Sequence, residues 1–298
     1  MRRWLLWGGM AAGVGAVVRS LARREPADLH GQVVLITGAS SGIGAATAHA
    51  FAQHGAHVAL TARRTDRIDR LAHELAACYG VWTLAVPADL LQDADRQRLV
   101  RAVEDESGRI DVLVNNAGRL WTGHFCEQDP AVLQDLLQIN LYVPLRLAQL
   151  VLPGMIARGA GHIVNVSSIG GRGMPPFIAG YVASKAGLIG FSSSLRREVA
   201  RQGVHVADVL PAFTETPMLG GIDRARLRRV GFRLDPPDVP ARAIVDAVRR
   251  NRRETFLIGP TELVIGVINH LAPGLMDRLI TAFVTPRLAA ELARLPHE

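Results

Sequence analysis

The sequence predicts a doubly wound α/β fold with a parallel sheet, organised around one main domain. Short β-branched apolar runs, of the kind buried on both faces of a parallel sheet, precede helix-forming segments. The first run, Gln32 to Thr37, leads into the glycine-rich turn Gly38–Gly44 and then into a helical segment, Ala45 to His54. The 298 residues suffice for one large α/β domain or two small ones.

Composition argues against several classes of function. Cys78 and Cys126 provide neither a disulfide framework nor a metal-ligand spacing, and the ten histidines form no Cys/His cluster. We therefore expect no metal site and a reducing compartment. The net charge of +7 and the pI near 10.5 are compatible with nucleic acid or an anionic membrane surface. No nucleic-acid motif accompanies this charge, and the dispersed arginines favour solvated helix faces.

The glycine-rich turn is a candidate phosphate site. Its glycines allow the backbone to approach a pyrophosphate, and the helix N-terminus that follows offers free N–H groups and the positive end of a dipole. The turn lies between a strand and a helix, as a dinucleotide-binding mechanism requires. The candidate contacts in the turn are Gly38, Ser40, Ser41, Gly42, Ile43 and Gly44.

Tyr181 and Lys185 are a candidate proton-transfer pair. They are four residues apart in the helical segment Ala179 to Arg201, so both side chains lie on one face. A fixed cation near the phenol lowers its pKa from the usual value of about 10. Lys185 is the only lysine among 34 Lys and Arg residues, which indicates a need for a compact ammonium that relays a proton. The alternative is an ordinary pair on a helix surface.

Five motifs, in order and in register, resemble the single-domain branch of the short-chain dehydrogenase/reductase superfamily. They are Thr37–Gly44, Asn115–Gly118, Asn140, Ser168 and Tyr181-x-x-x-Lys185. The resemblance extends over about residues 32–259 and implies a Rossmann fold. It also implies a catalytic tetrad of Asn140, Ser168, Tyr181 and Lys185, in which Asn140 holds a water that connects the lysine to solvent. Ser168 has the family spacing to Tyr181, and Ser167 is the weaker candidate.

The end of the second predicted strand, Ala56 to Ala62, carries Arg63 and Arg64 and no acidic residue. In a dinucleotide-binding fold, an acidic residue here would hold the ribose 2′-hydroxyl, whereas Arg accommodates a 2′-phosphate. We therefore expect NADP(H) in preference to NAD(H), with Arg63 as the first phosphate partner and Arg64 as the second. Alternatively, both arginines are solvated residues at the start of the helix Asp66 to Tyr79.

The resemblance assigns further cofactor contacts to the ends of later strands. Asp89 and Leu90 follow the third strand, Val81 to Val86, and the family has an Asp at the adenine ring. For Asp89 the alternative is a helix N-cap. Asn115, Ala117 and Gly118 follow the fourth strand, Ile110 to Val114. Phe213, Thr214 and Thr216 follow the sixth, Val204 to Leu210. Ala212 departs from the glycine that the family usually has there.

The implied reaction is hydride transfer between NADP(H) and a carbonyl or secondary alcohol carbon. Tyr181 exchanges the proton with the reacting oxygen, Lys185 lowers the phenol pKa and binds the nicotinamide ribose, and Ser168 orients that oxygen. We expect an apolar substrate, such as a steroid, retinoid, fatty aldehyde or 3-ketoacyl chain. The alternatives are a membrane-tethered NADP(H)-binding module without turnover, and an epimerase or dehydratase on the same fold.

The two ends of the chain predict contact with a membrane. Trp4 to Val18 is a charge-free run between arginines, about 22 Å long as a helix and thus shorter than a roughly 30 Å hydrocarbon core. We interpret residues 1–26 as an anchor with the domain facing the cytoplasm. A cleaved secretory signal and an apolar tail are the alternatives.

The remaining boundaries follow from this interpretation. Residues 27–31 form a linker, 32–260 the Rossmann-fold domain, and 261–298 an amphipathic helical extension that covers the substrate entrance, joins a homodimer or homotetramer, or enters the membrane. The arginine-rich segment Leu219 to Leu234 is expected to shape the substrate pocket as a lid.

Overall fold

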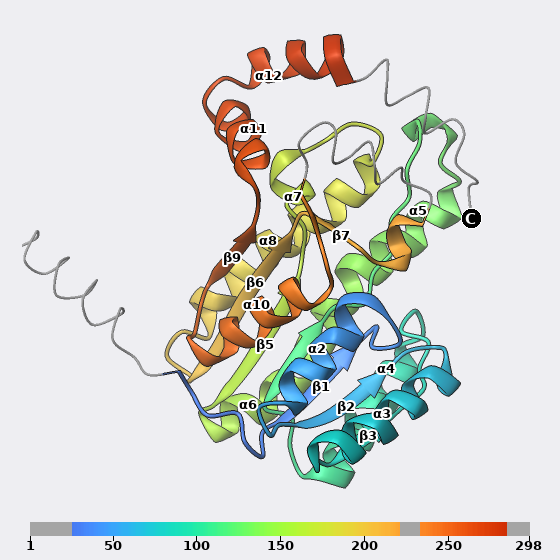
Figure 1. The fold of residues 1–298 in the computed structure, drawn as a ribbon, viewed down its shortest axis with the longest axis vertical. Coiled ribbons are helices and arrows are strands. Elements are labelled where there is room, and N and C mark those ends of the chain that lie inside the picture. The colour runs from blue at the N-terminus through green and yellow to red at the C-terminus, as the bar shows by residue number, and fades with distance from the viewer. Residues whose placement is uncertain (1–25, 221–232, 285–298) are drawn as a thin grey trace, which may run out of the picture.

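The computed structural model describes residues 26–220 and 233–284, and within these ranges seven strands form one sheet (Figure 1). The strand order is β3-β2-β1-β4-β5-β6-β9, and neighbouring strands run parallel. Because the order reverses between β1 and β4, a crevice is expected there at the carboxyl ends of the strands. The strand bounds are β1 Val33–Thr37, β2 His57–Thr61, β3 Thr83–Ala85, β4 Val112–Asn115, β5 Gly161–Val166, β6 Val204–Pro211 and β9 Glu254–Leu257.

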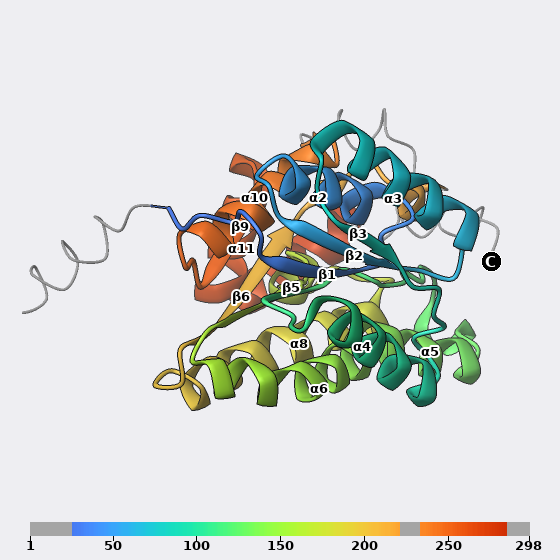
Figure 2. The same ribbon diagram turned by 90° about the horizontal axis from the view of Figure 1, so that it is seen from below.

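Helices cover both faces of the sheet, as predicted (Figure 2). One layer contains α2 (Gly42–Ala52), α3 (Thr65–Tyr79) and α10 (Asp238–Arg249), and the other contains α4 (Asp93–Ser107), α6 (Val143–Arg158) and α8 (Ala179–Glu198). Side chains alternate between the two faces of a strand. In β1, Val34 and Ile36 therefore enter one hydrophobic core, whereas Val33 and Leu35 enter the other.

The predicted single helix from Pro130 to Arg158 is interrupted. Helix α5 (Pro130–Leu137) passes into a π-helical turn, η2 (Gln138–Tyr142), before α6 begins. Pro144 lacks the backbone N–H that the carbonyl of Asn140 would accept from, so a regular ladder cannot continue. Such turns often mark functional sites. Here the turn contains Asn140.

This interrupted run is the one helical segment in the described ranges that is long and apolar enough to cross a membrane. Its composition has another explanation, because the buried side chains of α6 pack against the sheet in one of the two cores. These include Val143, Leu147, Val151 and Met155. The run is thus a core helix of the domain.

Two helices follow the last strand. They are α11 (Pro260–Leu271) and α12 (Pro273–Leu279), followed by a π-helical turn, η4 (Ile280–Val284). The extension predicted from residue 261 is therefore helical as far as residue 284. In Figure 1 the two helices stand at the end of the molecule where α7 lies.

Small elements complete the described chain. Among them, η1 is Phe125–Glu127, α7 is Gly170–Gly173, and η3 is Pro217–Leu219. The short strands β7 (Phe213–Thr214) and β8 (Leu234–Asp235) pair in parallel. None of these elements was predicted from sequence.

The segment predicted as a linker packs against the domain. The backbone N–H of Ala27 donates to the carbonyl of Arg249 over 2.7 Å, and Leu29 is buried in the core. Residues 1–25, which contain nearly all of the predicted anchor, lie outside the described ranges. So do residues 221–232, which contain most of the predicted lid.

Candidate active site

Helix α8 places Tyr181 and Lys185 side by side. The Nζ atom of Lys185 lies 5.8 Å from the centre of the Tyr181 ring. Lys185 is buried and donates to the carbonyl of Val166, at the end of β5, over 2.8 Å. The sheet therefore holds the ammonium beneath the phenol, as the spacing predicted.

Ser168, two residues after the end of β5, completes a polar group with Tyr181. Its hydroxyl forms a hydrogen bond with the Tyr181 phenol and accepts a second from the backbone N–H of Gly170 over 3.0 Å. Ser167 instead donates to the carbonyl of Lys185 over 3.1 Å, which joins β5 to α8. Of the two serines, Ser168 alone contacts the phenol.

The predicted fall in the Tyr181 pKa is not found. Burial raises the pKa of the phenol above its ordinary value, and the hydrogen bond with Ser168 offsets only part of that rise. Burial also lowers the pKa of Lys185 to about 8. The prediction considered the charge of Lys185 and left out desolvation, which disfavours the charged form of both groups. At neutral pH the phenol keeps its proton.

Asn140 is fully buried behind this pair. Its Oδ1 accepts from the N–H of Arg119 and its Nδ2 donates to the carbonyl of Arg119, each over 2.8 Å, and Nδ2 also reaches Ser184 Oγ at 3.1 Å. A Cβ at Gly118 would lie 2.9 Å from Asn140 Oδ1 and 3.7 Å from Lys185 Nζ, so the backbone passes between them. Because the Asn140 amide is already paired, the expected water would have to bind its backbone carbonyl.

The glycine-rich turn has the form of a phosphate cradle. Gly38 and Gly42 have positive φ, and a Cβ at Gly44 would lie 2.4 Å from the carbonyl oxygen of Gly38. Ser41, the N-cap of α2, makes no side-chain bond to the first turn of that helix. The leading N–H groups of α2 are thus left for a ligand, as an anion site requires. Residues 38 and 40–43 line a cleft of about 1150 Å³.

Arg63 and Arg64 both reach this cleft at the end of β2. The Nη2 atom of Arg64 donates to Ser40 Oγ over 2.7 Å and to Ser41 Oγ over 3.0 Å. Arg63 is exposed and lines the same cleft. A 2′-phosphate in this corner would meet two guanidinium groups, and the structure fixes Arg64 against the cradle.

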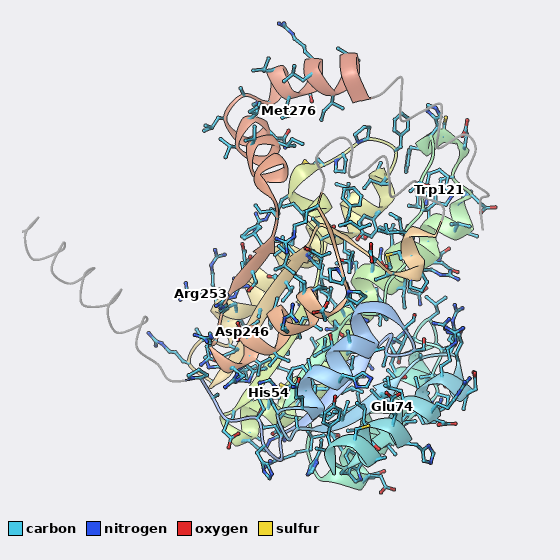
Figure 3. All side chains as sticks on the ribbon, in the orientation of Figure 1. His54, Glu74, Trp121, Asp246, Arg253 and Met276 are labelled. Atoms are coloured by element: carbon cyan, nitrogen blue, oxygen red, sulfur yellow. The ribbon has the colours of Figure 1, made fainter. Side chains whose placement is uncertain are left out.

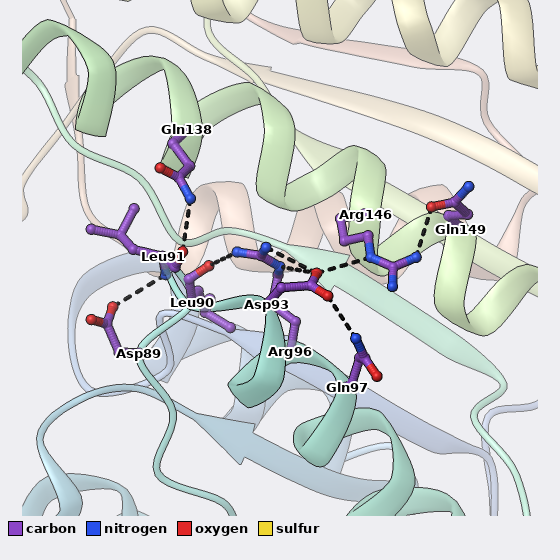
Figure 4. Close-up of polar contacts among 9 residues, drawn as sticks. All are labelled: Asp89, Leu90, Leu91, Asp93, Arg96, Gln97, Gln138, Arg146 and Gln149. Carbon is purple, nitrogen blue, oxygen red and sulfur yellow. Dashed lines mark hydrogen bonds and ion pairs between the residues drawn. The ribbon is translucent and has the colours of Figure 1, made fainter.

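The loop after β3 is held by a polar network (Figure 4). Asp93 accepts from Arg146 and Arg96, each over 3.0 Å, and from Gln97 over 2.6 Å. The hydrogen bonds from Arg146, Gln97 and Arg96 hold the pKa of its carboxyl well below the usual range. Arg96 also donates to the carbonyl of Leu90, and Gln138 donates to that of Leu91 over 2.7 Å. The network therefore joins three elements, α4, η2 and α6, to the loop after β3 that lines the cleft.

Asp89 and Leu90 line the cleft as predicted. Asp89 Oδ1 accepts from the N–H of Leu91 over 3.2 Å, and the N-cap of α4 is Gln92. The alternative role of Asp89 as that N-cap is therefore not observed.

The remaining predicted cofactor residues divide into two groups. Asn115 is buried away from the cleft, and its Nδ2 donates to Asn165 Oδ1 over 2.8 Å, which joins β4 to β5. Gly44 does not line the cleft but lies against the carbonyl of Gly38 in the turn. The others line the cleft, namely Ala117, Gly118, Phe213, Thr214 and Thr216. Ala212 does not have a positive φ, so the turn does not need the glycine that the family usually has.

The half of the cleft beyond Ser168 and Tyr181 has a mostly apolar wall that the sequence did not identify. It comes from the loop after β4, from the segment around α7 and from α11. The lining residues include Leu120, Trp121, Ile169, Pro175, Ile178 and Ile265. Figure 3 shows Trp121 and Met276 toward the end of the molecule opposite His54. In the sequence, Trp121 was the available signal for the loop after β4. It is one of only four tryptophans in the chain and lies three residues after Gly118.

Of the predicted lid, only the margins fall within the described part of the chain. Leu219 lines the cleft, as does Met218 just before the predicted lid, and Arg233 pairs with Asp235. Arg224, Arg226, Arg228 and Arg229 lie outside it. Arg172, which was not predicted, lines the cleft and pairs with Glu254 at 3.0 Å.

Comparison with known protein families and sequences agrees with this geometry. A family model described as short chain dehydrogenase matches residues 32–226. A ketoacyl reductase, HetN, of a Nostoc species is 31% identical over 86% of this chain and 90% of the relative. Dehydrogenase/reductase SDR family member 7B of Danio rerio is 31% identical over 89% of each chain. Glycine betaine reductase ATRR of Emericella nidulans is 37% identical, but this chain spans only 19% of its length.

Solved structures give the same result. A short-chain dehydrogenase from Sphingobium yanoikuyae in complex with NADPH has a TM-score of 0.71 and 34% identity, over 83% of this chain and 95% of that one. An alcohol dehydrogenase from Thermococcus sibiricus complexed with 5-hydroxy-NADP has a TM-score of 0.70 and 26% identity, over 77% of this chain and 97% of that one.

Proposed function

Because this chain belongs to the short-chain dehydrogenase family, we propose that it is an NADP(H)-dependent oxidoreductase acting on the carbonyl or secondary alcohol of an apolar substrate. One observation carries the proposal. Ser168, Tyr181 and Lys185 meet between a phosphate cradle and a largely apolar compartment of the same cleft. A site for cofactor binding alone would not need this proton-transfer group.

The residues present fit NADP(H). The α2 N-terminus and residues 38–44 would hold the pyrophosphate, Arg63 and Arg64 the 2′-phosphate, and Asp89 the adenine. Lys185 would hold the nicotinamide ribose, with Phe213, Thr214 and Thr216 around the carboxamide and phosphates. When bound, the cofactor donates or accepts the hydride. The NADPH- and NADP-type ligands in the similar structures support this choice over NAD(H).

The protein residues manage the proton. In reduction, Ser168 donates a hydrogen bond to the substrate carbonyl oxygen, and Tyr181 transfers its phenolic proton to that oxygen as the carbon receives the hydride. The products are an alcohol and a phenolate, which Lys185 reprotonates. Oxidation of an alcohol reverses these steps. The raised phenol pKa keeps Tyr181 in the protonated form that reduction requires.

The apolar wall supports a lipid-like substrate, such as a fatty aldehyde, a 3-ketoacyl chain, a steroid or a retinoid. We further propose that residues 1–26 attach the protein to a membrane, with the catalytic domain on the cytoplasmic side. The charge-free run from Trp4 to Val18 supports this attachment.

The test is NADPH oxidation by detergent-solubilised full-length protein with a panel of lipid-like ketones and aldehydes, with NADH in parallel. We expect Tyr181→Phe to lower turnover by at least about a hundredfold, because the general acid is lost. NADPH affinity should stay within about tenfold, since the cradle and arginines are unchanged.

Tyr79→Phe on α3 is the matched control, because it removes the same hydroxyl far from the cleft. Equal losses of turnover and NADPH affinity in Tyr181→Phe would contradict the proton-transfer role. NADPH binding without turnover on any substrate would favour a binding module.

A further inference from the structure

Helix α11 closes the substrate side of the cleft. Ile265 and Gly266 are the α11 residues that line it. The helix packs on α7, whose first residue, Gly170, would bring a Cβ within 3.3 Å of Ser168 Oγ and 3.7 Å of the Tyr181 ring. Ser168 and Tyr181 thus lie at one end of α7, and α11 forms the cleft wall on the other side of that helix.

Gly266 has no structural reason to be glycine. It lies in the interior of α11, where glycine is the least favourable residue after proline, and it is not among the residues with positive φ. Among the described residues, a Cβ at this position would meet no atom within 4 Å. By contrast, a Cβ at Gly180 in α8 would lie 2.7 Å from Leu133, so packing explains that glycine.

The room left by Gly266 opens into the cleft, because this residue is part of the cleft wall. Apolar side chains line the same cleft, among them Ile265, which precedes Gly266 on the helix, and Met218 and Leu219. A group that fills the space therefore has to be apolar. It also has to be attached to a substrate whose reacting carbon lies at Ser168 and Tyr181.

We propose that Gly266 is a specificity-determining residue, which leaves room for the apolar tail of the substrate and so sets the longest tail that the cleft accepts. The inference rests on the proposed reductase function. It adds that the enzyme distinguishes substrates by tail length at α11. Filling the space should exclude long tails and leave the chemistry of short ones unchanged.

The experiment measures kcat/KM with NADPH for unbranched aldehydes from propanal to hexadecanal. Each methylene that the cleft buries should raise kcat/KM up to about fourfold. In Gly266→Leu we expect values for the shortest aldehydes within about twofold of the wild type, and a loss of about fifteenfold once two methylenes are excluded. Gly266→Ala should give a smaller change in the same direction, and it favours the helix, so misfolding does not explain its effect.

Gly274→Leu is the matched control. A Cβ at Gly274 also meets no atom within 4 Å in the part of the chain that the structure describes, but Gly274 lies in α12 and is not among the residues that line the cleft. An equal change in the Gly274 variant, an unchanged profile in the Gly266 variants, or a parallel loss at every chain length would overturn the proposal.

A binding measurement separates this inference from the proposed function. If the wild type oxidised no NADPH with any aldehyde, the reductase proposal would fail. Calorimetric titration with dodecanol would still test the space at Gly266. Weaker binding to Gly266→Leu than to the wild type and Gly274→Leu would support the inference, and equal binding to all three would overturn it.

Discussion

Burial acts on both titratable side chains of the candidate site. It holds the proton on Tyr181 by raising its pKa, and it makes Lys185 easier to deprotonate, with a pKa of about 8. A neutral phenol and a largely protonated amine at pH 7 are the forms that reduction of a carbonyl requires. The folded protein therefore contains a desolvated Lys185 ammonium. This desolvation lowers the free energy of unfolding.

Replacement of Lys185 by Met should abolish turnover and raise stability. A pKa shift from 10.5 to about 8 corresponds to roughly 3 kcal/mol, from which about 1 is subtracted for the lost bond to Val166. Lys185 releases its proton at about pH 8 in the native state and at about pH 10.5 in the unfolded state, so the gain should be full below pH 8 and shrink between these two values. Thermal unfolding at pH 7 and pH 10 measures both effects. A lower Tm for the variant at pH 7 would contradict this account.

The two arginines at the end of β2 should determine cofactor choice. Hydrogen bonds to charged groups contribute about 1.5–3 kcal/mol. We therefore expect Arg63→Ala and Arg64→Ala each to weaken NADPH binding by at least about tenfold and NADH binding much less. Titration of each variant with both cofactors would rank the two residues. Arg67→Ala on α3, the helix that follows the two arginines, serves as the control. Equal losses for NADPH and NADH would argue against a 2′-phosphate site.

At the scale of elements, a row of polar residues crosses the middle of the sheet. Asn115, Asn165 and Asp208 are partners in register on β4, β5 and β6. Asn165 donates to Ser192 Oγ of α8 over 2.8 Å, and Asp208 pairs with Arg196 of α8 at 3.0 Å. The row therefore fixes α8, the helix of Tyr181 and Lys185, on the sheet. It also explains why Asn115, predicted to contact the cofactor, points elsewhere.

Asp208 should make stability depend on pH. Burial raises the pKa of this carboxyl to about 7 against the opposing effects of Ser192 and Arg196. The native state then holds a proton that the unfolded state has released, so stability falls as pH rises from about 4 to 7, by roughly 4 kcal/mol in total. Asp208→Asn should abolish this slope and be more stable than the wild type at pH 8.

Urea unfolding at pH 5 and pH 8 measures the difference. Asp246→Asn on α10 is the control, because that carboxyl is only partly buried. A wild type whose stability rises between these pH values would show that Arg196 stabilises the charged carboxylate instead.

At the scale of the whole molecule, the described domain provides the catalytic parts, and the predicted anchor lies before it. Exposed aliphatic side chains also follow α11 and α12 at helical spacing, namely Val264, Val267, Leu271, Leu275 and Leu279. The proposed membrane contact therefore has two candidate parts of the chain, the predicted anchor and this face of α11 and α12. They differ in that α11 also lines the cleft.

Deletion of residues 1–26 should release the protein from the membrane fraction and leave NADPH turnover within about twofold. The cut lies before Ala27, whose N–H bonds to Arg249, and before the buried Leu29. Fractionation and turnover of the truncated and full-length proteins give the answer. Continued pelleting of an active truncated protein would place the attachment on α11 and α12. Loss of turnover would show that the segment belongs to the domain.

Local patterns in the sequence predicted the strands of the seven-stranded sheet, the helix layers, the cradle and the Tyr181–Lys185 pair, because apolar periodicity, glycine turns and helical spacing report on neighbours along the chain. The choice of Ser168 came from the family resemblance. The π-helical turn at Asn140 was not predicted. Pro144, four residues later, could have indicated it, because proline has no N–H to donate to the carbonyl of Asn140.

The surroundings of those residues could be read from the folded chain alone. The raised Tyr181 pKa, the direction of Asn115, the contact of Arg64 with Ser40 and Ser41, and the position of α11 at the cleft all involve segments far apart in sequence. Desolvation and cross-strand register depend on which segments meet in space, and a local pattern carries no record of that.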